Sequence, residues 1–231
     1  METTPKKNIF QEPALETREN YSLELLEMLS RLNICSKEFI NLQFDHEVQA
    51  NSVIKPLQGK GRVQGNYSVI KPILSSSKGI GLGQGIFSGY SDISTYWMAA
   101  AGIDLAVRQA ICAGSNAQKI ALLDNFCWCS STEAEKLWEL ELAARACYDF
   151  STAYQTPFIS GKDSMFNDFK GFSSNDEPIK ISVPPTLLIS SVGIVDNIEK
   201  CISMDLKSEG DLIYLLGDTH EEMGASEYYR Y

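Results

Sequence analysis

The chain has 231 residues, a formal net charge of −10 and 44% hydrophobic residues, so it is long enough for one large domain or one domain plus part of another. This composition excludes wholesale disorder, and the negative charge argues against sequence-independent binding to nucleic acid or to an anionic membrane. No apolar run is long enough to span a membrane and the start METTPKKNIF lacks a signal-peptide core, so we expect a cytoplasmic chain whose six cysteines are reduced.

The N-terminal part begins with a polar stretch, residues 1–20, which we expect to be a flexible tail. Helical spacing of leucines then predicts a helix over residues 21–32, with Ser22 as its cap and a buried stripe that starts at Leu25. Apolar pairs at 53–54 and 69–70 predict short strands.

The rest of the chain alternates between apolar runs and helical patterns. We expect helices over residues 95–112, ended by Gly114, and over 133–154, capped by Ser131 or Thr132. Further predicted elements are strands at 120–123, 158–159, 186–195 and 211–216 and a polar loop or hairpin at 167–183. The alternation has no regular βαβ order, which favours an α+β fold over a doubly wound parallel sheet.

Glycines crowd the stretch SSSKGIGLGQGIFSG between Ser75 and Gly89. Such a backbone can approach a phosphate closely, but the dinucleotide fingerprint GxGxxG is not met in any register. The pattern alone favours a glycine-rich strand or turn.

The string Ser160-Gly161-Lys162-Asp163-Ser164 follows a predicted strand. It is not a Walker A loop, because Thr156 and Asp163 stand where that loop needs glycine and a hydroxyl residue. Glycine, lysine and a carboxylate are still suited to a phosphorylated ligand or a cation. A ligand site and a tight polar turn both remain open.

Asp124 and Asn125 emerge directly from the apolar run at 120–123. Polar groups at the end of a buried strand are a common place for a site, while the alternative is that Asp124 caps the following turn. The neighbouring pair Cys127 and Cys129 is a weak metal signal, because no second Cys/His pair lies nearby. Glutamates 133, 135, 139 and 141 are typical of a solvated helix face.

Longer strings resemble the synthetase subunit of phosphoribosylformylglycinamidine synthase, in that family's order. They are SKEFINLQFDHEVQ, SVIKPLQGKG, YWMAAAGID, KIALLDNFCW, ACYDFSTAYQTPFISGKDSM, PPTLLISSVGIVD and GDLIYLLGDTHEEMGASEYY. The resemblance implies an aminoimidazole-ribonucleotide-synthetase-like N-type domain of the subunit's second half, a mixed sheet with helices on one face. Its implied boundaries are a lead-in helix at 21–39, the N-type domain at 40–197 and the start of an incomplete C-type domain at 198–231.

The family is a ligase of purine biosynthesis. It uses ATP and Mg²⁺ to convert formylglycinamide ribonucleotide and glutamine-derived ammonia into formylglycinamidine ribonucleotide. The resemblance implies that Asp124, Gly161 and Lys162 bind the nucleotide and that Ser164 binds the ribonucleotide substrate. It implies no catalytic residue and no defined metal ligand within this chain, which would be inactive in isolation. The implied partners are the first half of the synthetase, the glutaminase subunit and a small bridging subunit.

This chain departs from the family pattern at several positions. Asn66, Leu105 and Gln109 stand where the second half often has acidic or amide ligands for a nucleotide–magnesium site. Further departures are Asn51, Cys129 and Ala225, each at a position where the family has glycine. The alternative reading is therefore a non-catalytic remnant that binds or supports a partner subunit.

Overall fold

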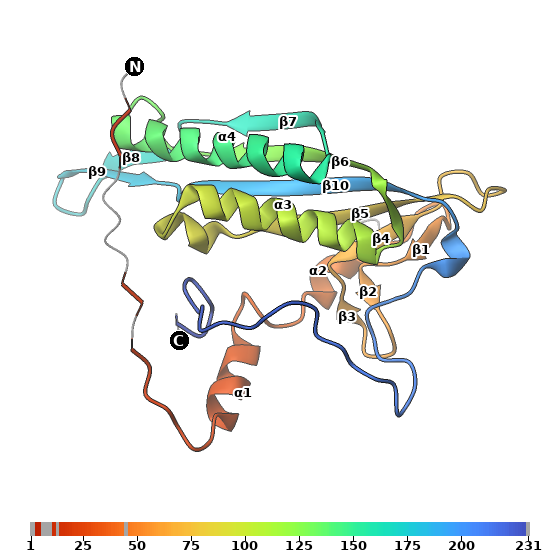
Figure 1. Cartoon of the computed structure of the whole chain (residues 1–231). Coiled ribbons are helices and arrows are strands. Elements are labelled where there is room, and N and C mark those ends of the chain that lie inside the picture. Colours follow the sequence, from red (N-terminus) through yellow and green to blue (C-terminus); the bar gives the residue numbers. More distant parts are fainter. Residues whose placement is uncertain (1–2, 6–10, 13, 44–45, 230–231) are drawn as a thin grey trace.

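The computed structural model describes residues 3–5, 11–12, 14–43 and 46–229 (Figure 1). Its helices are α1 (Ser22–Ser30), α2 (Glu38–Gln43), α3 (Thr95–Cys112) and α4 (Ala134–Tyr154), with short 3-10 turns at Ser88–Asp92 and Ile198–Lys200. Its strands are β1 (Ser52–Ile54), β2 (Leu57–Gln58), β3 (Val63–Gln64), β4 (Tyr67–Ile70), β5 (Gly79–Ile86), β6 (Ser115–Cys127), β7 (Phe158–Ser164), β8 (Asp168–Phe172), β9 (Pro178–Ser182) and β10 (Thr186–Val195).

Six of these strands form one mixed sheet in the order β1-β4-β5-β10-β6-β7. All neighbours are antiparallel except β6 and β7, which run parallel and are joined through α4. Helices α3 and α4 lie side by side on one face of the sheet (Figure 1). The predicted α+β class, with a mixed sheet and helices on one face, is confirmed.

The glycine-rich stretch is the central strand β5, so the expectation of a glycine-rich strand is confirmed. Its glycines alternate toward α3, while Leu82 and Gln84 point to the other face. A Cβ at Gly85 would lie 2.0 Å from the carbonyl oxygen of Gly102 on α3. The glycines are therefore needed because the helix packs directly on the strand backbone.

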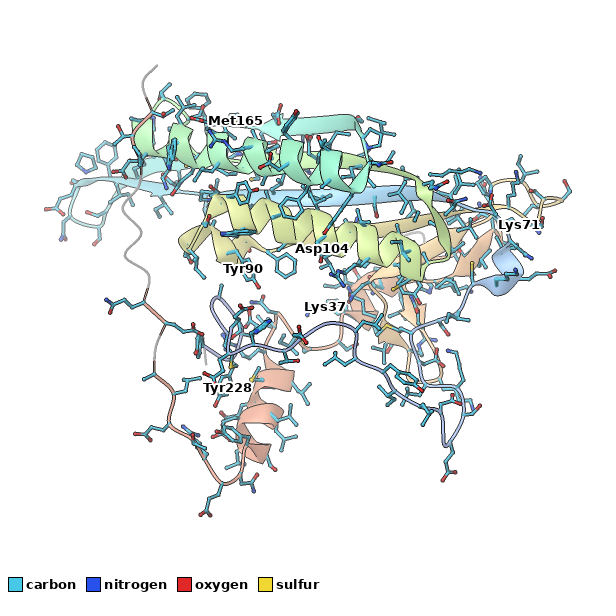
Figure 2. The ribbon with its side chains drawn as sticks, in the orientation of Figure 1. Lys37, Lys71, Tyr90, Asp104, Met165 and Tyr228 are labelled. Atoms are coloured by element: carbon cyan, nitrogen blue, oxygen red, sulfur yellow. The ribbon has the colours of Figure 1, made fainter. Side chains whose placement is uncertain are left out.

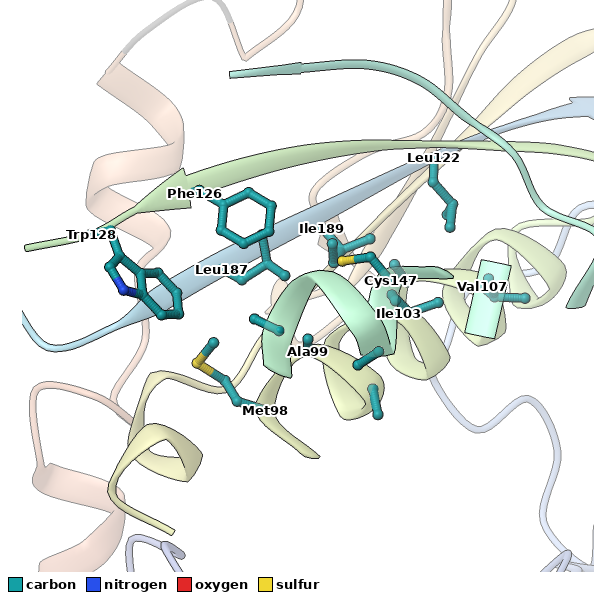
Figure 3. Packing of buried hydrophobic residues seen from close by; sticks show 14 of the residues in the cluster. Met98, Ala99, Ile103, Val107, Leu122, Phe126, Trp128, Cys147, Leu187 and Ile189 are labelled. Carbon is teal, nitrogen blue, oxygen red and sulfur yellow. The ribbon is translucent and has the colours of Figure 1, made fainter. Parts of the chain in front are cut away.

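The core lies between the helices and the sheet (Figure 3). Trp128 and Met98 are its largest fully buried side chains, and Leu187 and Ile189 of β10 are also fully buried. Alanines on α3 and α4 allow the two helices to approach each other and the sheet. The predicted helix 95–112 and the strand 186–195 match α3 and β10 residue for residue.

The predicted helix ends are only partly right. Gly114 follows α3 with φ +93°, a conformation that favours glycine, so this stop signal is confirmed. The predicted caps are wrong, because Tyr21 and Glu133 hold the N-cap positions of α1 and α4 and neither makes a side-chain capping bond. The Asn20 side chain instead accepts a hydrogen bond from the Ser22 backbone N–H.

The buried stripe predicted for α1 is wrong. Leu25 and Leu29 are 57% and 52% exposed, and Glu24, paired with Arg18, is the helix's buried residue. Figure 1 shows α1 standing apart from the sheet, so its leucines do not pack on the sheet. The solvated face predicted for α4 is wrong at Glu139, which is buried and pairs with Lys136.

The strand predicted at 211–216 is absent. Residues Leu212, Ile213, Tyr214, Leu215 and Leu216 are irregular and 77–90% exposed. The predicted strand at 158–159 extends to Ser164, and the stretch 167–183 is the β8–β9 hairpin. A strand needs a neighbour that satisfies its backbone, and the described part of the chain provides none beside residues 212–216.

The face of the sheet opposite α3 and α4 carries mostly apolar side chains. Leu82 and Ile86 of β5 and Ile194 of β10 are exposed there. We call this surface the open face; its residues are Ser68, Ile70, Ile80, Leu82, Gln84, Ile86, Ala121, Leu123, Asn125, Leu188, Ser190, Val192 and Ile194. Among the described helices, none is both long and apolar enough to cross a membrane.

Candidate functional site

The sheet brings two of the predicted site residues together. Strands β6 and β7 run parallel, and their register places Asp124 directly opposite Gly161. A Cβ on Gly161 would lie 1.8 Å from the Asp124 Oδ1 atom. Glycine at 161 is therefore required by the position of the Asp124 carboxylate, a constraint that the sequence does not reveal.

Asp124 lies inside β6 and not at a turn, so the alternative that it caps a turn is wrong. The string 160–164 likewise belongs to the edge strand β7, so the tight-turn reading of it is also wrong. Asp124 and the string 160–164 both belong to strands, which hold their side chains more rigidly than loops would.

The electrostatics of Asp124 favour its protonated form relative to an ordinary aspartate. Burial raises the pKa of Asp124, the negative charge of Asp163 raises it further, and a hydrogen bond from the Lys162 backbone N–H lowers it in part. Sequence reasoning missed Asp163 as a neighbour, because only the β6–β7 register brings it close. On the helix side, burial followed by the charge of Asp124 raises the pKa of the Cys147 thiol to about 12.

The side chains of the other two predicted site residues, Lys162 and Ser164, lie on the opposite face of the sheet from Asp124 and Gly161. Successive side chains of a strand point to opposite faces, so Lys162 and Ser164 share a face with Asn125 and Cys127, their register partners. Asp124 and Gly161 lie toward the helices. Because β7 is the edge strand, groups on its two faces could meet a ligand only around that edge.

Gln109, one of the departures from the family pattern, is used inside the fold. It is buried, and its side-chain oxygen accepts a hydrogen bond of 2.7 Å from the Gln84 backbone N–H. A Cβ on Gly83 would lie 2.7 Å from the Gln109 Cβ, so helix and strand are in direct contact at this point. The Gln109 side-chain oxygen therefore links α3 to β5.

Two of the cavities formed by the described residues lie away from Asp124. One, of about 700 Å³, is lined by Tyr90, Trp97, Phe150 and Asp104 on the helix side, where Figure 2 labels Tyr90 and Asp104. The other, of about 490 Å³, lies on the open face and includes Asn66, another departure from the family pattern. None of the four predicted site residues lines either cavity.

The described residues contain no cluster of three or more histidine, cysteine, aspartate or glutamate side chains that could hold a metal ion. Cys129 is buried, whereas the Cys127 sulfur accepts a contact of 3.6 Å from the Asn167 amide. The Asp163 carboxylate lies near enough to Asp124 for its negative charge to raise the pKa of Asp124.

The structure is thus an α+β domain in which a carboxylate and a glycine, Asp124 of β6 and Gly161 of β7, lie side by side on parallel strands at one edge of the sheet. Its sequence is similar to phosphoribosylformylglycinamidine synthase subunit PurL from Methanocaldococcus jannaschii, with 33% identity over 214 residues, 92% of this chain and 27% of the relative. PurL from Methanothrix thermoacetophila is 31% identical over 227 residues, 95% of this chain and 27% of the relative. No family model matches the chain.

Solved structures agree on the fold. PurLQS from Thermotoga maritima superimposes with a TM-score of 0.54 at 20% identity, covering 89% of this chain and 28% of the other. Thermotoga maritima PurL complexed with ATP gives a TM-score of 0.51, covering 87% of this chain and 27% of the other, at 20% identity. The structure of Thermotoga maritima PurL complexed with FGAR gives a TM-score of 0.50 at 21% identity, covering 88% of this chain and 27% of the other.

The resemblance inferred from the sequence strings is confirmed, and the chain is a relative of one part of PurL. It spans about 27% of the length of the curated relatives it matches.

Proposed function

We propose that this chain is one part of a phosphoribosylformylglycinamidine synthase and acts only together with the remainder of the synthetase. The reaction joins ammonia to formylglycinamide ribonucleotide at the expense of ATP. The observation that carries the proposal is the similarity of 92% of this chain to PurL at 33% identity. The boundaries at 40 and 197, and the assignment to the second half, are part of the proposal.

The edge of β6 and β7 is the proposed nucleotide site. Gly161 leaves room for the Asp124 carboxylate, and Lys162 supplies a cation for a phosphate oxygen. Asp124 and Asp163 are suited to a magnesium ion that is also held by nucleotide phosphates, since Mg²⁺ usually needs only one or two protein carboxylates there. When bound, the ion would neutralise phosphate charge. Ser164, on the Lys162 face, is the proposed contact to the ribonucleotide substrate.

The open face is the proposed docking surface for the missing first half. A contiguous apolar surface on a monomer commonly marks an interface, and Leu82, Ile86 and Ile194 are exposed on this one. Residues 198–231 would begin the C-type domain, and Leu212–Leu216 would become a strand when that domain is completed. The glutaminase and bridging subunits are proposed as further partners in the cytoplasm.

A second candidate is a structural remnant that supports a partner and binds no nucleotide. The specific observation in its favour is Gln109, whose side chain is buried and bonded to the strand backbone where the family often has a ligand. Asn66 and Leu105 add to it, because neither side chain carries a charge.

Calorimetric titration of ATP–Mg²⁺ and of formylglycinamide ribonucleotide distinguishes the two candidates. The purified chain is titrated alone and again with the complementary first half. Binding that appears only with both halves, and that is weakened by Lys162→Ala, supports the synthase. The matched control is Lys170→Ala, in the exposed β8–β9 hairpin. No binding in either case contradicts the synthase proposal and leaves the structural remnant.

A further inference from the structure

The cavity of about 700 Å³ on the helix side is walled by aromatic rings from three elements. Helix α3 contributes Trp97, α4 contributes Phe150 and Tyr154, and the 3-10 turn before α3 contributes Tyr90. Trp97 is 60% exposed and Tyr154 is 39% exposed, so both offer ring surface to a ligand. The helices separate this cavity from the open face, so docking of the first half on that face would leave the cavity uncovered.

Each of the four rings is held in place by a contact of its own. Tyr90 and Phe150 pack against the hydrophobic core. The Tyr154 hydroxyl donates a hydrogen bond of 2.8 Å to the Asp104 carboxylate, and its ring stands at 88° to that of Phe150. Trp97 makes an edge-on contact with the tyrosine before it, with the ring centroids 5.0 Å apart. The walls are therefore formed before a ligand binds, which lowers the entropic cost of binding.

The floor of the cavity is one face of α3. Trp97, Ala101 and Asp104 follow one another at intervals of four and three residues, which places their side chains on one side of the helix. Ala101 and its neighbour Ala100 are small, so they leave open space between the indole ring and the Asp104 carboxylate. A ligand lying on α3 would thus meet an aromatic ring at one end and a carboxylate at the other.

The charge of the cavity is negative. Among the described residues that line it, the charged ones are three carboxylates and one guanidinium, those of Glu12, Asp104, Glu222 and Arg108. Arg108 forms an ion pair of 2.6 Å with Asp104, so the two carboxylates of Glu12 and Glu222 give the lining its excess negative charge. The chain as a whole carries a formal net charge of −10. This field attracts a cation and repels an anion.

We propose that this cavity binds a small organic cation, an ammonium ion that carries methyl or methylene groups on its nitrogen. The faces of aromatic rings attract such a cation within about 6 Å of the ring centre, and quaternary ammonium ions are commonly held by several rings at once. The volume lies within the usual range of about 300–1,000 Å³ for ligand pockets. The inference goes beyond the proposed synthase function and does not depend on it.

Choline and 3,3-dimethylbutan-1-ol are the matched probes, because they have the same shape and only choline carries a positive charge. Each is titrated into the whole chain and followed through the NMR signal of its own methyl groups, which ring currents shift when the methyl groups lie on aromatic faces. Choline is expected to bind at least about fivefold more tightly than the alcohol, since only the cation is attracted by the rings and the carboxylates. The proposal is overturned if millimolar choline shows no shift, or if the alcohol binds as tightly.

Trp97→Leu removes an aromatic wall but keeps an apolar side chain. This variant is expected to weaken choline about threefold or more and to leave the alcohol unchanged. Tyr148→Leu is the matched control, because Tyr148 is an exposed ring of α4 outside the lining, and this variant is expected to bind choline as the native chain does. An equal loss of choline in both variants, or an equal loss of both probes in Trp97→Leu, contradicts the proposal.

Arg108→Gln tests the role of charge. It releases the Asp104 carboxylate from its ion pair, so choline is expected to bind about twofold or more tightly at low salt. Unchanged or weaker binding of choline in this variant overturns the proposal. The two-half titration of ATP–Mg²⁺ is a separate measurement, so the failure of either proposal is seen independently of the other.

Discussion

Strand β10 (Thr186–Val195) and residues Leu212–Leu216 are two apolar runs, of which the first is a buried strand and the second is irregular and exposed. Leu187 and Ile189 of β10 are fully buried, whereas Leu215 is 79% exposed. Both runs have the composition of a buried strand. The difference is that β10 has β5 and β6 on its two sides and α3 above it. An apolar run becomes a strand only where other elements pair with its backbone and cover its side chains.

The first prediction contrasts these two runs and has the largest expected effect. Ile189→Ala is expected to lower the free energy of unfolding by about 2–5 kcal/mol, because it opens a cavity in the packed core. Leu215→Ala is expected to change it by no more than about 0.5 kcal/mol, since the side chain is exposed. Urea unfolding followed by circular dichroism measures both. A comparable loss in Leu215→Ala would show that the segment is packed after all.

The second prediction compares two glutamates on α4. Glu139 is buried beside Lys136, and Glu141 forms an exposed pair with Arg145. Glu139→Ala is expected to cost about 1.5–3 kcal/mol of unfolding free energy, because a charge-assisted bond is lost. Glu141→Ala is expected to cost at most about 0.5 kcal/mol. Equal costs in the same urea assay would mean that Glu139 is solvated, as its sequence pattern predicts.

The third prediction concerns the Asp124–Gly161 pair. Gly161→Ala is expected to lower the free energy of unfolding by about 1–3 kcal/mol, because the new methyl group would overlap the Asp124 carboxylate. Asp124→Gly removes that carboxylate, so Gly161→Ala should cost less in an Asp124→Gly background. Thermal unfolding of the native protein, the two single variants and the double variant completes the double-mutant cycle. Additive effects would contradict direct contact between the two residues.

The fourth prediction is the smallest and concerns pH. The pKa of Asp124 is raised in the folded chain, so folding is disfavoured once the carboxyl ionises in the unfolded state. Asp124→Asn is therefore expected to raise the urea midpoint at pH 7. The gain should shrink as the pH falls toward about 3.9, the ordinary pKa of an unfolded aspartate. A gain that is constant between pH 7 and pH 4 would exclude ionisation as the cause.

Local patterns predicted much of the helix-covered body. Helical periodicity between Thr95 and Cys112, with Gly114 after it, was enough to predict α3 and its end. The apolar run at 186–195 predicted β10. Each of these two elements buries one whole face, so its apolar residues recur at the regular spacing of a helix or a strand, and this spacing can be recognised in the sequence. The caps were not predictable in this way, because Ser22 and Thr132 lie beside helix starts whose capping bonds they do not make.

The candidate site was predictable only in part. Asp124 and Gly161 stood out because each follows an apolar run, but their contact depends on the β6–β7 register. The same register brings Asp163 toward Asp124 and places the Lys162 side chain on the opposite face of the sheet. The open face had a signal too, since it carries a polar side chain among apolar ones in both strands, Gln84 in β5 and Ser190 in β10. That signal has no meaning until the strands are ordered in a sheet.

The sequence by itself determined the α+β class, most helices and strands and the relationship to PurL, because these depend on local periodicity and on long matching strings. The tertiary structure decided which apolar runs are covered, which glycines face α3 and which polar groups meet. These outcomes depend on contacts between residues far apart in the chain. Burial, register and packing are properties of pairs of elements, and no single segment contains them.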